Sequence, residues 1–89
     1  MPCKLSVDTE VKLDILSCSD DERQQIGDFL VLLQENPLPE GRQDMRDSAF
    51  TYQLPCGYIV SWEVLGDWMK FALSGNTKNI TVRILGIGR

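Results

Sequence analysis

Three cysteines and the absence of histidine decide which chemistry this chain of 89 residues can carry out. Cys3, Cys18 and Cys56 are an odd number without a Cys-x-x-Cys spacing, so reduced thiols are expected, and a zinc site would need an unusual ligand set. Histidine is the residue most often used for acid–base catalysis near neutral pH. Without it, no Ser–His or Cys–His nucleophile pair can form. No metal or other cofactor is therefore expected.

The charges are distributed unevenly along the chain. Residues 1–47 contain eleven acidic and five basic side chains, a balance of −6, whereas residues 48–89 contain two acidic and four basic ones, a balance of +2. Contacts with phosphates dominate the affinity of proteins for nucleic acids, and they require a basic patch. Four cations spread over two segments form a weak patch, so nonspecific binding to nucleic acid is not expected.

Length and hydropathy predict one small domain over residues 1–89. The chain is 43% hydrophobic and 25% charged, which is typical of a globular protein rather than a disordered one. No apolar run approaches the roughly 20 residues that a membrane-spanning helix needs, and the first residues contain no apolar stretch long enough for a secretory signal. We therefore expect a soluble cytoplasmic protein that does not associate with membranes.

The clearest local signals predict a helix over residues 20–35. Ser19 and Glu22 have the spacing of a capping box, in which each side chain accepts a hydrogen bond from the other residue's backbone N–H. Asn36 precedes Pro37, and a residue before proline avoids helical angles, so the helix should end there. The apolar residues recur at helical spacing and form one stripe: Ile26, Phe29, Leu30 and Leu33.

The remaining elements are predicted from alternation. Residues 4–7 form a candidate strand, and alternation over residues 10–16 favours another, although a helix over residues 8–17 stays open. Residues 42–47 form a loop or one helical turn. Strands are predicted over residues 50–54, 58–65 and 80–87, with a turn at residues 55–57. Residues 68–73 are apolar enough for a strand or a short helix. The order predicts an α+β fold with an antiparallel sheet.

Three segments resemble the RelE/ParE superfamily of small bacterial toxins from toxin–antitoxin pairs. The connection from Pro37 to Gly41 is similar to the family's Pro-x-x-x-Gly connection. Residues 52–64, Tyr-Gln-Leu-Pro-Cys-Gly-Tyr-Ile-Val-Ser-Trp-Glu-Val, are similar to the family block Tyr-Arg-Leu-Arg-x-Gly-x-Tyr-Arg-Val-x-Tyr-Glu-Val. Residues 82–89 are similar to its closing Val-x-Val-Leu-x-Ile-Gly-x-Arg strand. The resemblance implies a RelE-like fold, with an N-terminal helical segment packed on an antiparallel sheet of about four strands.

The resemblance also implies a chemistry, from which this chain departs. RelE-type ribonucleases let a 2′-hydroxyl of messenger RNA attack the neighbouring phosphate, while lysines and arginines on the sheet neutralise the developing charge. Uncharged residues stand where the family has these cations: Gln53, Pro55, Ile59 and Gly86. Relatives often carry further catalytic residues in a tail after the closing strand, and we expect none here beyond Arg89. The catalytic candidates that remain are Arg83 and Arg89, with Tyr58 as the proton donor, although solvated cations and a buried aromatic are the favoured interpretations.

Three functions follow from these observations. The leading hypothesis is a RelE/ParE-like protein that lacks efficient ribonuclease activity and acts by binding a protein partner, such as the antitoxin peptide that the resemblance implies. The second is an active toxin, either a ribosome-dependent and metal-independent endoribonuclease or an inhibitor of gyrase. The third is an unrelated small α+β interaction domain.

The connection over residues 66–79 is about ten residues longer than a tight hairpin of roughly 2–5 residues requires. It contains Trp68, Met69 and Phe71. An aromatic-rich insertion in a small domain is either a flap over the sheet or a partner surface that uses Trp68 and Phe71, and the sequence does not decide between these two roles.

Overall fold

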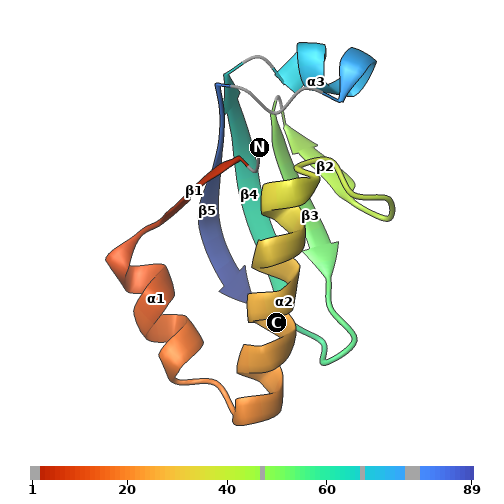
Figure 1. Cartoon of the computed structure of the whole chain (residues 1–89). Coiled ribbons are helices and arrows are strands. Elements are labelled where there is room, and N and C mark those ends of the chain that lie inside the picture. The colour runs from red at the N-terminus through yellow and green to blue at the C-terminus, as the bar shows by residue number, and fades with distance from the viewer. Residues whose placement is uncertain (1–2, 47, 67, 76–78) are drawn as a thin grey trace.

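A computed structural model describes residues 3–46, 48–66, 68–75 and 79–89. Five strands form one sheet in the order β1-β5-β4-β3-β2, and helices α1 and α2 cover one of its faces (Figure 1). Helix α3 lies at the end of the sheet where β4 finishes (Figure 1). The elements are β1 (Lys4–Val7), α1 (Thr9–Leu16), α2 (Asp20–Glu35), β2 (Gln43–Arg46), β3 (Ala49–Gln53), β4 (Ile59–Gly66), α3 (Trp68–Ser74) and β5 (Ile80–Gly88).

Helix α2 has the bounds that its local signals predict. The Glu22 backbone N–H donates to the Ser19 hydroxyl over 3.3 Å, and the Ser19 backbone N–H donates to the Glu22 carboxylate over 2.9 Å. The predicted capping box is therefore present, and Asn36 leaves the helix with extended angles before Pro37. The apolar stripe of α2 packs on the sheet through Ile26, Phe29 and Leu33, all of them buried.

Helix α1 corrects the prediction of a strand near residues 10–16. Val11 and Ile15 lie one helical turn apart and face the protein, Val11 being 4% exposed and Ile15 packing against the core. Leu13, between them in sequence, lies on the outer side of the helix and is 60% exposed. The apparent alternation therefore arises from two inward residues at helical spacing and one solvent-facing leucine. The candidate strand over residues 4–7 is present as β1.

The sheet has five strands rather than about four, and it is mixed rather than antiparallel. Strand β1 runs parallel to β5, whereas all other neighbouring strands are antiparallel. Strand β2 replaces the predicted loop or helical turn, and all four of its residues are exposed. A strand with no buried side gives no alternating pattern, which is why the sequence does not reveal it. The predicted strands over residues 50–54, 58–65 and 80–87 are confirmed as β3, β4 and β5.

Trp62 joins the sheet to the end of α2. Its side chain is 0% exposed, and its Nε1–H donates to the Pro37 carbonyl over 3.1 Å. The Phe29 ring contacts Trp62 edge-on, with centroids 5.5 Å apart, and stacks on Tyr52 at 4.8 Å. Trp62 and Tyr52 therefore belong to the core between helix and sheet.

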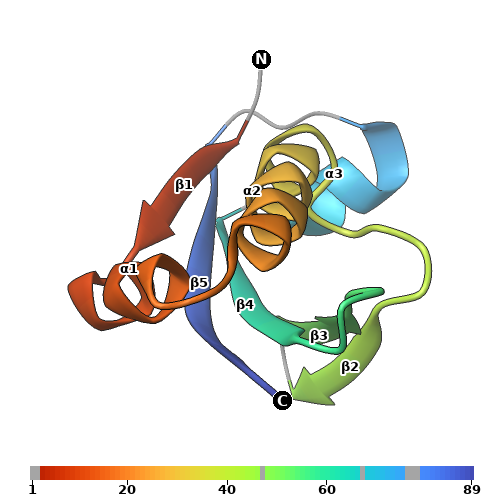
Figure 2. The ribbon, with the colours of Figure 1, turned by 90° about the horizontal axis from the view of Figure 1, so that it is seen from below.

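Figure 2 shows the two helices on one side of the curved sheet, and no described residue forms a helix on the other side. We call that other side the open face.

Candidate functional site

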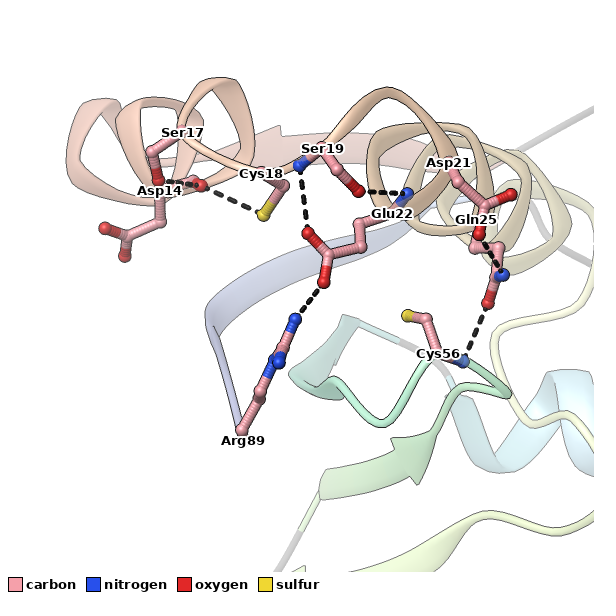
Figure 3. Close-up of polar contacts among 9 residues, drawn as sticks. All are labelled: Asp14, Ser17, Cys18, Ser19, Asp21, Glu22, Gln25, Cys56 and Arg89. Carbon is pink, nitrogen blue, oxygen red and sulfur yellow. Dashed lines mark hydrogen bonds and ion pairs between the residues drawn. The ribbon is translucent and has the colours of Figure 1, made fainter.

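Two of the three predicted catalytic residues lie together at the end of β5. The Arg89 guanidinium lies over the Tyr58 ring, 4.5 Å from the ring centroid. It also forms an ion pair with Glu22 on the first turn of α2 (Figure 3). Arg89 is therefore held by a carboxylate and an aromatic ring of its own chain, on the side of the sheet that carries the helices.

Glu22 has two partners at once. Its carboxylate accepts the Ser19 backbone N–H that closes the capping box, and it pairs with Arg89 (Figure 3). The Ser19 N–H is the main cause that holds the pKa of Glu22 below its ordinary value, and Arg89 adds to the effect. The same carboxylate raises the pKa of Arg89. The ion pair is therefore formed at neutral pH.

The Tyr58 hydroxyl can donate a proton but is not a base at neutral pH. A side-chain hydrogen bond with Cys18 is the largest cause that raises the pKa of Tyr58 above its ordinary value, followed by burial, and the negative charge of Glu22 adds to the effect. Arg89 lowers the pKa of Tyr58 but does not reverse the shift. The Cys18 Sγ in turn donates to the Asp14 carbonyl over 3.3 Å (Figure 3). Tyr58 is thus tied to the turn between α1 and α2.

Arg83, the third predicted residue, lies on the open face, away from Arg89. Its neighbours Val82 and Ile84 are buried under the helices, so alternation along the strand turns Arg83 the other way. Its guanidinium pairs with the carboxylates of Glu63 at 3.4 Å and Asp8 at 3.5 Å. Such exposed pairs contribute about 0–1 kcal/mol each. Both arginines are engaged by acids, and they do not point toward a common ligand.

A bulge in β5 explains why the two arginines face opposite ways. Residues six positions apart in a regular strand lie on the same face, because side chains alternate. Here Trp62 pairs with Ile84 and the preceding Ser61 pairs with Gly86, so Leu85 is an extra residue in β5. One extra residue turns every later side chain to the other face. Arg89 is therefore moved from the open face to the helical side.

A hollow of about 330 Å³ extends across β2, β3 and β4. Two of its lining residues, Gln53 and Ile59, pair across β3 and β4 and occupy positions at which the resemblance places cations. None of the lining residues carries a charge: they are Gly41, Gln43, Thr51, Tyr52, Gln53 and Ile59. Sequence reasoning missed Gln43 and Thr51, because β2 was not predicted and the register that brings them together depends on it.

The predicted partner residues Trp68 and Phe71 lie in helix α3, so the open choice between strand and helix is decided for the helix. Phe71 is half-buried and packs against the core, which favours a flap at its position. The side chain of Trp68 lies outside what the structure describes. Met69 and Leu73 are 63% and 88% exposed, so α3 also offers apolar surface to solvent. The partner role of Trp68 and Phe71 stays a prediction.

The three cysteines are free thiols, with Cys3 and Cys18 buried and Cys56 half-buried. Within the described ranges, no group of three or more cysteine, aspartate or glutamate side chains is arranged to hold a metal ion. The helices that the structure describes include none long and apolar enough to cross a membrane.

These features define an α+β fold of the RelE type: N-terminal helices on a mixed, mostly antiparallel sheet of five strands. The chain is similar in structure to a free-state double-arginine-to-alanine mutant of the E. coli toxin RelE, with a TM-score of 0.73 and 18% sequence identity over 100% of this chain and 84% of that chain. At this identity the likeness is one of fold, and the RelE-like fold expected from the sequence is confirmed. No protein-family model and no curated protein matches the sequence.

The Glu22 ion pair predicts how stability depends on pH. Because the folded pKa of Glu22 lies below the unfolded value of about 4.3, Glu22 stabilises the fold above that value and ceases to do so as the pH falls through its folded pKa. Glu22→Gln should therefore lower the free energy of unfolding at neutral pH and weaken its decline in acid. Urea unfolding between about pH 7 and pH 3 measures both effects.

Asp28→Asn is the matched control for Glu22→Gln. Asp28 is an exposed carboxylate on the same helix, whose partner is the neutral amide of Gln24 at 2.9 Å. If the two variants lose the same stability at every pH, the Arg89 contact has no role in the acid dependence.

Proposed function

We propose that this chain is a RelE-fold relative of the toxins of toxin–antitoxin pairs that has little or no ribonuclease activity and acts in the cytoplasm by binding a protein partner. Residues 1–89 would form one RelE/ParE-like domain. The observation that carries the proposal is the uncharged lining of the hollow. Gln53 and Ile59 leave it without the cations on which the chemistry of such toxins depends.

Transition-state electrostatics explain why this lining matters. Cleavage by a 2′-hydroxyl builds negative charge on a phosphate, and removing one donor that stabilises such charge typically costs a factor of about 10²–10³ in rate. Arg83 and Arg89 cannot replace the missing cations together, because they lie on opposite sides of the sheet and pair with Glu63, Asp8 and Glu22. A slow or absent reaction is the expected consequence.

Partner binding is supported by surfaces that the fold leaves open. The described residues place helices on one face of the sheet only, and the exposed apolar side chains of α3 lie at the end of β4. Many toxins of the family that this chain resembles are held inactive by a disordered antitoxin segment. The expected partner of this chain is therefore a peptide segment of another protein. Trp68 and Phe71 are proposed to contribute to a partner contact at α3.

Induced expression in a bacterium, with translation monitored, tests the proposal. We expect normal growth and no cleavage of messenger RNA on ribosomes, and a DNA supercoiling assay covers gyrase. Growth arrest that disappears with Arg83→Ala and Arg89→Ala would contradict the proposal and support the active toxin. Circular dichroism of each variant is needed, because Arg89→Ala removes the contact with Glu22.

A double variant that returns cations to the hollow sharpens the test. Gln53→Lys with Ile59→Arg places two positive charges at paired positions of β3 and β4, in the lining of the hollow. If the missing charges limit the reaction, this variant should cleave RNA faster than the unchanged protein, by about 10² or more per restored contact where the geometry fits. Lys4→Arg, which leaves the charge unchanged on β1, is the control. Equal rates in all three proteins would show that these positions do not limit catalysis.

A further inference from the structure

Helix α1 has apolar side chains on two sides. Val11 and Ile15 face the core. Leu13 and Leu16 lie on the outer side and are 60% and 64% exposed. A surface helix usually has one apolar stripe and a polar opposite face, and single exposed leucines are common. Leu13 and Leu16, however, are three positions apart and therefore neighbours on the helix surface, so α1 presents a second apolar stripe to solvent.

Two acidic side chains lie along one flank of this outer pair. Glu10 and Asp14 are one helical turn apart, so they form a row beside Leu13. Both are exposed, and neither forms an ion pair with a cation among the residues that the structure describes. Figure 3 shows the Asp14 carboxylate turned away from the polar contacts of the turn that follows α1. We call these four residues the outer ridge of α1: Glu10, Leu13, Asp14 and Leu16.

The helical layer around the outer ridge is strongly acidic. Residues 8–35, which contain α1 and α2, include eight acidic and two basic side chains, a balance of −6. The two bases are Lys12, on the flank of α1 opposite the acidic row, and Arg23, which pairs with Asp20. A surface with an excess of one charge attracts ligands of the opposite charge. The charges therefore favour a cationic ligand at the outer ridge.

The apolar pair and the acidic row together define the class of this ligand. The acids repel nucleic acid and anionic lipid, which are themselves negatively charged. A second copy of this chain, docked ridge to ridge, would bring the same acids face to face. A basic amphipathic helix supplies both complements, because its apolar stripe can pack on the leucines while its cations lie next to the acids.

We propose that the outer ridge of α1 is the docking surface for a basic amphipathic helix of a protein partner. Apolar side chains of this helix pack on Leu13 and Leu16, and its lysines or arginines pair with Glu10 and Asp14. Figure 1 shows α1 on the β1 side of the molecule, away from α3, so this surface is separate from the contact proposed at α3. The inference rests on the proposed function, since it names where that function's partner binds and of what chemistry it is.

Fluorescence anisotropy with a labelled synthetic peptide tests the proposal. The probe is an amphipathic peptide of leucine and lysine, roughly 14 residues or four helical turns long, in about 0.15 M salt. We expect it to bind the unchanged protein. Leu13→Gln with Leu16→Gln should weaken binding by roughly tenfold or more, because the apolar contact is lost. Glutamine is a good helix former, so circular dichroism of this variant should be unchanged.

Asp14→Lys tests the acidic row separately from the leucines. The substitution replaces an attractive charge by a repulsive one and should weaken binding by roughly fivefold, the effect of about 1 kcal/mol from an exposed charge. Lysine is compatible with the last turn of α1, since a cation is favourable near a helix C-terminus.

Variants on α2 provide the matched controls. Val31→Gln with Leu32→Gln removes another exposed apolar pair, 60% and 45% exposed, and should leave binding unchanged. Asp28→Lys makes the same change of charge as Asp14→Lys, so it measures the effect of net charge alone and should weaken binding less. The inference is overturned if the peptide does not bind, if a peptide with glutamate in place of lysine binds as tightly, or if the α2 variants weaken binding as much as the α1 variants.

Ribosome-dependent cleavage, measured on the same preparations, separates the two proposals. Cleavage by the unchanged protein would contradict the proposed function. Peptide binding that ignores the α1 variants would contradict only the docking surface.

Discussion

Trp62→Ala is expected to destabilise the protein by roughly 3–5 kcal/mol, the usual effect of removing a buried tryptophan side chain. Trp62 is 0% exposed, contacts Phe29 and Phe50 at ring distances of 5.5 and 5.9 Å, and donates to the Pro37 carbonyl. A domain of this size has a free energy of unfolding of about 4–13 kcal/mol. The substitution therefore removes a large part of the total, and urea unfolding followed by circular dichroism should show a much lower midpoint.

Trp62→Phe separates the hydrogen bond from the packing. Phenylalanine keeps an aromatic ring beside Phe29 but leaves the Pro37 carbonyl without its donor, which costs about 1–3 kcal/mol when the acceptor stays buried. The loss should be smaller than for alanine. The connection after α2 should also loosen, which hydrogen exchange would detect. If alanine and phenylalanine lose the same stability, the contact with Pro37 rather than ring packing dominates.

Local signals explain why α2 could be predicted to its end residues while α1 could not. The signals that begin and end α2 act within one turn of its ends: they are Ser19, Glu22 and Pro37. Their effect on the helix bounds can therefore be predicted from neighbouring residues in the sequence. Helix α1 begins after Asp8, whose side chain makes no capping hydrogen bond, and it exposes Leu13 and Leu16. Its helical state therefore depends on packing against the rest of the fold, which periodicity does not contain.

The candidate site divides in the same way. The resemblance alone located Gln53 and Ile59, because they lie in a block with a recognisable order of residues. The separation of Arg83 from Arg89 could not be predicted, since it depends on one extra residue in β5 at Leu85. The pairing of Arg89 with Glu22 joins residues 67 positions apart, and such a contact exists only once the sheet and helix are packed. The missing cations at Gln53 and Ile59 were thus easier to predict from the sequence than the ion pairs that Arg83 and Arg89 form.

Gly66→Ala is expected to cost roughly 2–4 kcal/mol, because both the backbone and its surroundings require glycine there. The φ angle of Gly66 is +99°, which L-residues with a Cβ rarely adopt, and the added Cβ would lie 2.0 Å from the Asn79 carbonyl oxygen. This oxygen is backbone, so it cannot rotate away as a side chain would. Gly66 also pairs with Ile80, so the strain falls where β4 ends and β5 begins.

Gly86→Ala is the matched control, since it makes the same chemical change in the same sheet at an extended residue with free space around it. It should raise the free energy of unfolding by about 0.4–1 kcal/mol, because alanine restricts the unfolded chain more than glycine does. Urea unfolding of the two variants should thus move in opposite directions. Equal midpoints of urea unfolding for the two variants would mean that the chain can leave β4 without a glycine in the left-handed conformation at position 66. A destabilised Gly86→Ala would mean that Gly86 serves the packing of this chain in spite of the free space around it.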